Sequence, residues 1–179
     1  PGTAFGNEIM IADDTLAAVP TGTIGEILVR GANVMQGYLN QPEETAKTIS
    51  PDGWLRTGDL GYLDQDGYVF VSGRIKELII KGGEKIAPRE IDEALLEHEA
   101  VLEAAAFAVP CENYGERVEA CIRLKEQVHA SASDLLAHCQ TRLGKFKSPD
   151  TIHILEDLPK GPSGKVQRLK LFGLVYPTE

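Results

Sequence analysis

"SGRIKELIIKGGEKIAP" (residues 72–88) is the stretch at which the pattern of this 179-residue chain changes. Two very short apolar runs flank Gly82-Gly83, which predicts two short strands joined by a tight turn. The segment before this stretch is rich in strand patterns, and the segment after it mixes strands with helices. The sequence therefore predicts a boundary here, with one part at residues 1–75 and a second at residues 76–179.

The second part reads as a compact α+β domain. Pro88 opens a helix whose apolar face is predicted to be Ile91, Leu95 and Leu96. Further along, the pattern predicts strands at "VLEAAAFAVP" (101–110), "VEACIRLK" (118–125) and "TIHILED" (151–157), and a helix from the Ser131–Asp134 cap to about Leu143, stopping at Gly144. This order predicts a short sheet flanked by helices.

The first part reads as mostly β structure. "GEILVRG" (25–31) has the alternation of a strand, and residues 41–50 form a short helix with Pro42 at its first position. Residues 61–73 predict a hairpin whose turn contains Asp66-Gly67. Because so few short strands cannot enclose a core alone, we expect this part to be the remnant of a larger domain.

Composition excludes several classes of protein. The chain has 27 acidic and 18 basic side chains, which argues against nucleic acid as a partner. No apolar run approaches the roughly 20 residues that span a bilayer, so no transmembrane segment is expected. The three cysteines lack a C-x-x-C spacing and the histidines are scattered, so no metal site is predicted and a cytoplasmic location fits best.

The loop "LPKGPSGKVQR" (158–168) looks at first like a phosphate loop. A Walker A loop needs four residues between its glycines and a hydroxyl after the lysine. Only two residues separate Gly161 from Gly164, and Val166 follows Lys165. Lys165 is then either an ordinary surface lysine or a mobile cation that swings into a site built elsewhere.

Other candidate residues flank the boundary at 72–88. Asp59, in "RTGD", is either a turn residue or a carboxylate that accepts both hydroxyls of a ribose. Arg74 offers a forked donor for a phosphate or ribose. Gly82 and Gly83 form either a simple tight turn, which composition favours, or a place where a thin ligand passes close to the backbone.

In this order and spacing, the segments "TGTIGEILVRGANVMQGYLNQPEET", "GWLRTGDLGYLDQDGYVFVSGRIKELIIKGGEKIAPREID" and "LPKGPSGKVQR" resemble the C-terminal third of the adenylate-forming superfamily. This superfamily includes acyl-CoA synthetases, peptide-synthetase adenylation domains and beetle luciferases. "LGKFKSPD" (143–150) is more similar to the CoA ligases than to the peptide synthetases. The resemblance covers nearly the whole chain.

The resemblance implies a role for each candidate residue. Asp59 and Arg74 would contact the ribose and phosphates of ATP or AMP, and Lys76 would be the hinge of a swinging C-terminal domain. Gly82 and Gly83 would line the tunnel for the pantetheine arm of CoA. Lys165 would bridge the carboxylate and the α-phosphate during adenylation.

The implied function is ATP-dependent ligation of a small or fatty carboxylic acid to CoA. In family members the phosphate loop, the motif that holds Mg²⁺ and the acyl pocket lie upstream of the segment matched here. We therefore expect Mg²⁺ ligands outside this chain, and we expect the chain alone to be inactive. The alternatives are an acyl-AMP ligase or a peptide-synthetase adenylation domain that loads an acyl carrier protein, and a non-catalytic docking or regulatory module.

Overall fold

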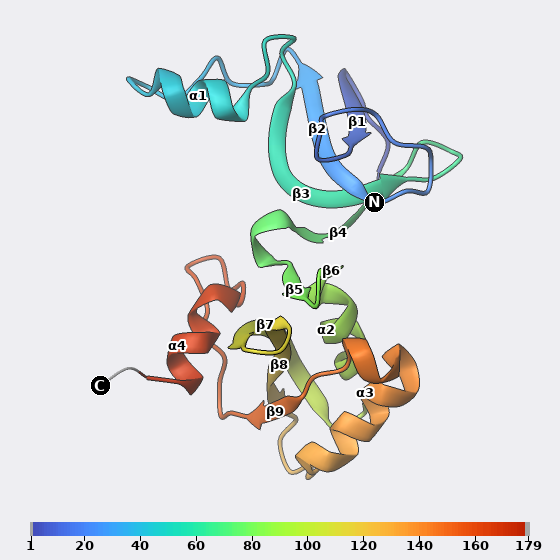
Figure 1. Ribbon diagram of the computed structural model, residues 1–179, viewed down its shortest axis with the longest axis vertical. Helices are drawn as coiled ribbons and strands as arrows, with labels where there is room; N and C mark the ends of the chain where they lie inside the picture. The colour runs from blue at the N-terminus through green and yellow to red at the C-terminus, as the bar shows by residue number, and fades with distance from the viewer. Residues whose placement is uncertain (1, 178–179) are drawn as a thin grey trace. The chain divides into compact units, whose positions relative to one another are not determined.

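The computed structural model describes residues 2–177 of the chain. They form two compact units, the first ending at Lys76 and the second beginning at Glu77. Figure 1 shows the elements of each unit along the chain. The two units are described separately below.

The first unit is a four-stranded antiparallel sheet in the order β1-β2-β3-β4. Its elements are β1 (Asn7–Ala12), β2 (Gly25–Gly31), α1 (Pro42–Thr48), β3 (Leu55–Leu63) and β4 (Val69–Arg74). The predicted strand, short helix and hairpin are confirmed. The sequence analysis missed β1, although "NEIMIA" brings the buried Ile11 and Ala12 against β2.

The β3–β4 turn shows how the chain is made to reverse. The Asp64 carboxylate accepts hydrogen bonds from the backbone N–H groups of Asp66 (3.0 Å) and Tyr68 (2.8 Å). Gly67 has φ +79°, a conformation that side chains rarely adopt. The turn sets the register from Leu63–Val69 to Gly61–Val71, and a one-residue shift between Gly61 and Leu60 then places Asp59 opposite Arg74.

The second unit is α+β, which confirms the predicted fold class. Its sheet has the order β6-β5-β8-β7, and β9 pairs in parallel with β8. Its elements are β5 (Ile79–Lys81), β6 (Glu84–Ile86), α2 (Pro88–Leu96), β7 (Val101–Cys111), β8 (Gly115–Leu124), α3 (Ala132–Lys147), β9 (Thr151–Ile154), η2 (Arg168–Lys170) and α4 (Leu171–Val175).

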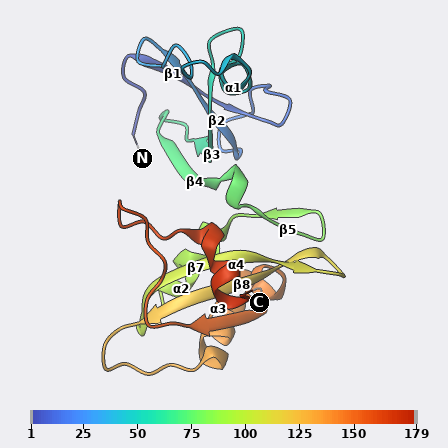
Figure 2. The same ribbon diagram turned by 90° about the vertical axis from the view of Figure 1, so that its left-hand side faces the viewer.

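Both faces of this sheet are covered (Figure 2). On one face, residues of α2 and α3, including Ile91 and Leu135, pack against alternate residues of the strands. On the other face, Phe107 of β7 packs with Leu158 and with Leu171 of α4. Because successive residues of a strand point to opposite faces, each of the central strands contributes to both cores.

One predicted core residue is wrong. Leu96 is 47% exposed, whereas Ile91 and Leu95 are fully buried. At about 100° per residue, Leu96 lies roughly 140° around the helix from Ile91. Ala94 and Asp92 are the other residues of α2 that face inward after Pro88.

Helix α3 begins at the predicted cap, but it does not stop at Gly144 as predicted and ends at Lys147 instead. The Ser131 hydroxyl accepts a hydrogen bond from the Asp134 backbone N–H (3.2 Å), and the Asp134 carboxylate accepts one from the Ser131 N–H, which completes a capping box. Gly144 (φ 72°, ψ 168°) interrupts the helical backbone, and a last turn follows it. Within residues 2–177, no helix combines the length and the apolar content needed to cross a bilayer.

Candidate functional site

The structure brings Asp59 and Arg74 together. They are register partners on β3 and β4, and Arg74 Nε lies 3.0 Å from Asp59 Oδ1. The Asp59 side chain is 31% exposed and the Arg74 side chain 52% exposed, so a ligand can reach both. The pair therefore presents a carboxylate acceptor and a guanidinium donor at one point on the sheet.

The backbone around Asp59 is held by polar groups from β2. Thr57 Oγ1 donates to the Ile27 carbonyl (2.7 Å) and accepts from the Asp59 N–H (3.1 Å). The buried Glu26 carboxylate accepts from the Gly58 N–H (3.2 Å) and from Arg56 Nη2 (2.8 Å). These bonds fix the "RTGD" segment, so the direction of Asp59 is set before any ligand binds.

A hollow of about 410 Å³ lies in the first unit next to this pair. This volume is within the range of small-molecule sites. Its walls contain four cationic side chains and one carboxylate, and the lining residues are Glu26, Tyr38, Lys47, Thr48, Arg56, Thr57, Gly58, Arg74, Ile75 and Lys76. The excess of positive charge favours an anionic ligand.

Lys76 lies in the 3₁₀ turn η1 (Ile75–Glu77), where the first unit ends. It also lines the cationic hollow. The position at the end of a unit is the one that a hinge requires, because few backbone angles there need to change when a domain turns.

Gly82 and Gly83 form the turn of the β5–β6 hairpin, with φ +59° and +87°. The Gly82 N–H donates to the Tyr114 carbonyl (2.9 Å), and a Cβ at this position would lie 3.2 Å from the Tyr114 ring. A Cβ at Gly83 would meet nothing within 4 Å. One glycine is thus required by a close contact, and the other leaves open space beside the backbone.

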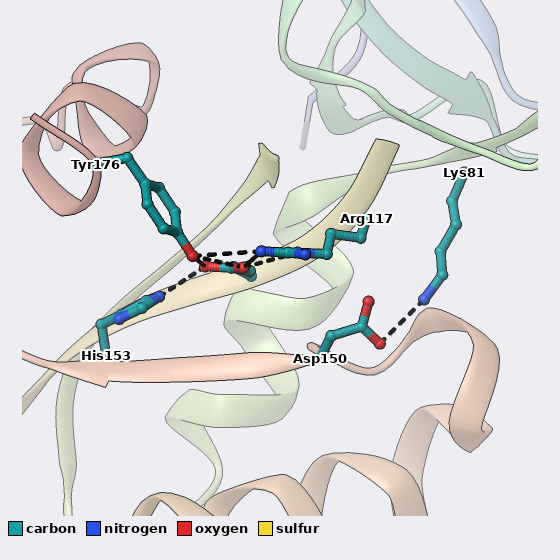
Figure 3. Close-up of polar contacts among 6 residues, drawn as sticks. Lys81, Arg117, Asp150, His153 and Tyr176 are labelled. Atoms are coloured by element: carbon teal, nitrogen blue, oxygen red, sulfur yellow. Dashed lines mark hydrogen bonds and ion pairs between the residues drawn. The ribbon is translucent and has the colours of Figure 1, made fainter. Parts of the chain in front are cut away.

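The strand before this turn is anchored by Lys81. Its side chain is 6% exposed, and Nζ lies 3.5 Å from Asp150 Oδ1 (Figure 3). Nζ also lies 5.4 Å from the centre of the Phe146 ring, a cation–π contact. The glycine turn is therefore fixed at its base.

Lys165 lies at the tip of a small hairpin of the second unit. The Gly161 N–H donates to the Lys165 carbonyl (2.9 Å), and the Gln167 N–H donates to the Pro159 carbonyl (2.7 Å). The Lys165 side chain is exposed, and its Nζ has no hydrogen-bond or ion-pair partner among residues 2–177. The backbone of this loop is hydrogen-bonded, and the exposed Lys165 side chain extends from it.

The predicted residues thus fall into two groups. Asp59, Arg74 and Lys76 belong to the first unit. The glycine turn and Lys165 belong to the second unit.

The sequence analysis missed a buried carboxylate in the second unit. Glu119 of β8 is fully buried and accepts hydrogen bonds from Arg117 Nε (2.8 Å) and the Tyr176 hydroxyl (2.9 Å). His153 Nε2 lies 2.7 Å from Glu119 Oε2, and Figure 3 shows these partners converging. Desolvation and the bond to Glu119 raise the pKa of Tyr176. A charged residue at an inward position of "VEACIRL" was the available signal.

The analysis also assigned no role to Arg168, although it lies three residues after Lys165. Its side chain is only 14% exposed and forms ion pairs with Glu77 and Asp92. An arginine among apolar residues after a glycine-rich loop was the signal. Within the described part of the chain, no group of three or more His, Cys, Asp or Glu side chains is arranged to hold a metal ion.

Comparison with known proteins places the chain in a family. Residues 90–165 match the model of the AMP-binding enzyme C-terminal domain. A sulfoacetate–CoA ligase of Cupriavidus necator is 55% identical over 152 residues, which cover 85% of this chain and 30% of that ligase. The chain spans about a third or less of the length of the curated relatives that it matches first.

Solved structures agree with this match. MatB from Rhodopseudomonas palustris with ATP bound gives a TM-score of 0.93 at 35% identity, over 98% of this chain and 36% of MatB. The same protein without ligand gives 0.72 over the same shares. These matches identify the chain as a C-terminal portion of the adenylate-forming superfamily. The chain belongs to the AMP-binding enzyme family and contains its C-terminal domain.

Proposed function

We propose that this chain is the C-terminal part of an ATP-dependent carboxylate–CoA ligase, with a boundary near residues 75–76 between the remnant of the large domain and the C-terminal lid. The observation that carries the proposal is the Asp59–Arg74 pair at 3.0 Å beside a cationic hollow. A carboxylate that accepts two ribose hydroxyls and a guanidinium that meets a phosphate match the two ends of AMP.

In the first half-reaction, a substrate carboxylate oxygen attacks the α-phosphorus of ATP. An O–P bond forms, the bond to the β-phosphate breaks, and pyrophosphate leaves. Negative charge spreads over the phosphoryl oxygens, and the unpaired Lys165 ammonium stabilises it once the loop reaches the site. One such pre-positioned donor is worth about 10²–10³ in rate. Mg²⁺, when bound through residues outside this chain, would neutralise the phosphates.

In the second half-reaction, the CoA thiolate attacks the acyl carbonyl of the adenylate. A C–S bond forms, AMP leaves with the oxygen, and the thiol proton passes to solvent. The open space beside Gly83 suits the narrow pantetheine arm. The lysine and the arm approach from different directions, so the second unit turns about Lys76 between the two steps.

The relatives support this mechanism and the choice of acceptor. The named relatives include several CoA ligases, which favours CoA over a carrier protein. A cytoplasmic location stays a prediction.

The test uses the full-length protein that carries this sequence, with Asp59→Asn and Lys165→Ala variants. We expect Lys165→Ala to lower carboxylate-dependent pyrophosphate exchange by about 10²-fold or more, while CoA still releases product from a pre-made acyl-adenylate. Asp59→Asn should raise the KM for ATP, because it weakens the acceptor for the ribose. If both half-reactions survive Lys165→Ala, the proposed role of this lysine is wrong. The 179-residue chain alone, as a further control, should release no pyrophosphate.

A further inference from the structure

One buried guanidinium connects the lysine loop to the start of the second unit. Arg168 Nε lies 3.1 Å from Glu77 Oε2, and Arg168 Nη2 lies 2.7 Å from Asp92 Oδ2. Arg168 Nη1 donates to Asp92 Oδ1 (3.3 Å) and to the Ala106 carbonyl. All three nitrogens of the guanidinium are therefore used, in a fork that a lysine cannot reproduce.

These partners come from distant parts of the sequence. Glu77 is the last residue of η1 and directly follows Lys76, the proposed hinge. Asp92 is on α2, and its Oδ1 also accepts from the Ala106 N–H of β7 (2.6 Å). Arg168 begins η2, three residues after Lys165. A single side chain thus links the residue after the hinge, the helix, the central sheet and the lysine loop.

Backbone contacts within the loop connect Arg168 to the tip that carries Lys165. Lys160 and Val166 form a β-bridge below the turn, and the Gln167 N–H is bonded to the Pro159 carbonyl. Leu158 and Leu171, on either side of the hairpin, are buried in one core. The loop is therefore a short hydrogen-bonded hairpin, and the direction of its tip depends on what holds residues 167–168.

We propose that Arg168 is a positioning residue for Lys165, which joins the lysine loop to the hinge so that the two move as one piece. The inference rests on the proposed role of Lys165 in adenylation. When the second unit turns, Glu77 is the first residue that moves with it. The Arg168–Glu77 pair then makes the base of the loop turn together with the residue after the hinge.

The alternative is that Arg168 serves only the stability of the core. The half-reactions separate the two possibilities. A positioning role predicts a loss in kcat for adenylation with an unchanged KM for ATP and an unchanged rate of thioester formation from pre-made acyl-adenylate. A purely structural role would lower both half-reactions together, because both need a folded second unit.

The experiment compares Arg168→Met, Arg168→Lys and Glu77→Gln in the full-length protein, with Lys165→Ala in parallel. Arg142→Met is the matched control, since Arg142 pairs with Glu97 and both side chains are about half exposed. We expect the Arg168 variants to lower adenylation about 10- to 100-fold, as a displacement of about 1 Å does. Arg168→Lys should not restore adenylation, because an ammonium group cannot form the same fork of bonds. Glu77→Gln should give a smaller loss, about threefold, because one charge-assisted bond weakens.

A second measurement does not depend on activity. Trypsin cleavage after Lys165 is followed in the 179-residue chain, and it should be faster in the Arg168 and Glu77 variants than in Arg142→Met. If Arg168→Met does not fold, Arg168→Lys and Glu77→Gln decide the question.

The outcomes are distinct. Loss of adenylation in Lys165→Ala without loss in the Arg168 and Glu77 variants overturns this inference and leaves the proposed function standing. Equal loss in both half-reactions also overturns it. No loss in Lys165→Ala removes the proposed function and this inference together. Unchanged trypsin cleavage in every variant contradicts the anchoring of the loop.

Discussion

At the scale of single residues, burial decides what each polar group can do. Asp59 and Arg74 remain partly exposed although they are paired, which suits a pair that exchanges its partner for a ligand. Glu119 is fully buried and is bonded to Arg117, His153 and Tyr176, which suits a structural carboxylate. Lys165 has no partner among the described residues, as a cation that works elsewhere requires.

The Glu119 cluster predicts a large loss of stability in Glu119→Gln. The glutamine amide would place N–H donors opposite the three groups that donate to Glu119, and the charge-assisted bonds would be lost. We expect the free energy of unfolding to fall by about 3 kcal/mol, measured by urea denaturation with circular dichroism. The control is Glu93→Gln, which breaks an exposed helical pair with Arg89 and should change stability by less than about 0.5 kcal/mol. Equal losses in the two variants would show that burial of Glu119 has no energetic weight.

The buried thiols predict a pH dependence. Desolvation raises the pKa of Cys121 and of Cys139 from 9.0 to about 11, whereas Cys111 is partly exposed. At pH 8 about one thiol in a thousand is then ionised at each buried position, so a thiol reagent should modify Cys111 first and all three only after unfolding. Folding opposes ionisation here, so stability should decline as the pH rises from 9.0 towards 11. Rapid modification of three native thiols at pH 8 would contradict this.

At the scale of elements, the β5–β6 hairpin shows how a two-residue turn is specified. Lys81 and Glu84 are register partners, so Gly82 and Gly83 alone make the turn. Both have positive φ, which matches the right-handed twist of the strands. Lys81, fixed by Asp150, holds the turn to the rest of the unit.

The two glycines should differ in what they tolerate. Gly82→Asn combines a positive φ with a contact at 3.2 Å to the Tyr114 ring, and should cost about 1–3 kcal/mol. Gly83→Asn, its matched variant, meets nothing within 4 Å, so only the backbone strain at φ +87° opposes it and the loss should be smaller, about 1 kcal/mol. In the full-length protein it should slow thioester formation more than adenylation. Thermal unfolding and the two half-reactions measure this, and an equal effect of both variants on stability would rule out the contact with Tyr114.

At the scale of the whole molecule, the chain consists of two compact units, divided after Lys76. Two native probes report on them separately. Trp54 is the single tryptophan and belongs to the first unit, whereas the three cysteines belong to the second. Unfolding of each unit can therefore be followed on its own.

We expect Glu119→Gln to shift the urea midpoint of thiol exposure and to leave the midpoint of Trp54 fluorescence in place. The physical reason is that every partner of Glu119 lies in the second unit. Glu26→Gln should do the reverse, since Glu26 is buried in the first unit with Arg56. A shift of both probes by either variant would show that the two units unfold as one.

Local sequence patterns predicted the α+β class, most of the strands and helices, the turns at Gly67 and Gly82-Gly83, and the motifs that carry Asp59, Arg74 and Lys165. Each of these signals is local, because turn chemistry and periodicity act over a few neighbouring residues. Even there, Leu96 was misplaced by its angle around a short helix, and β1 was missed.

Which side chains meet depends instead on the tertiary fold. Strand register brings Asp59 opposite Arg74. Glu119 contacts Tyr176 although 57 residues separate them, and Arg168 contacts Glu77 across 91 residues. No periodicity encodes such pairs, because they depend on how sheets and helices pack. Burial makes an unpaired charge costly, so Glu119 and Arg168 must be paired. Both look ordinary in the sequence, but their ion pairs hold elements of the second unit together.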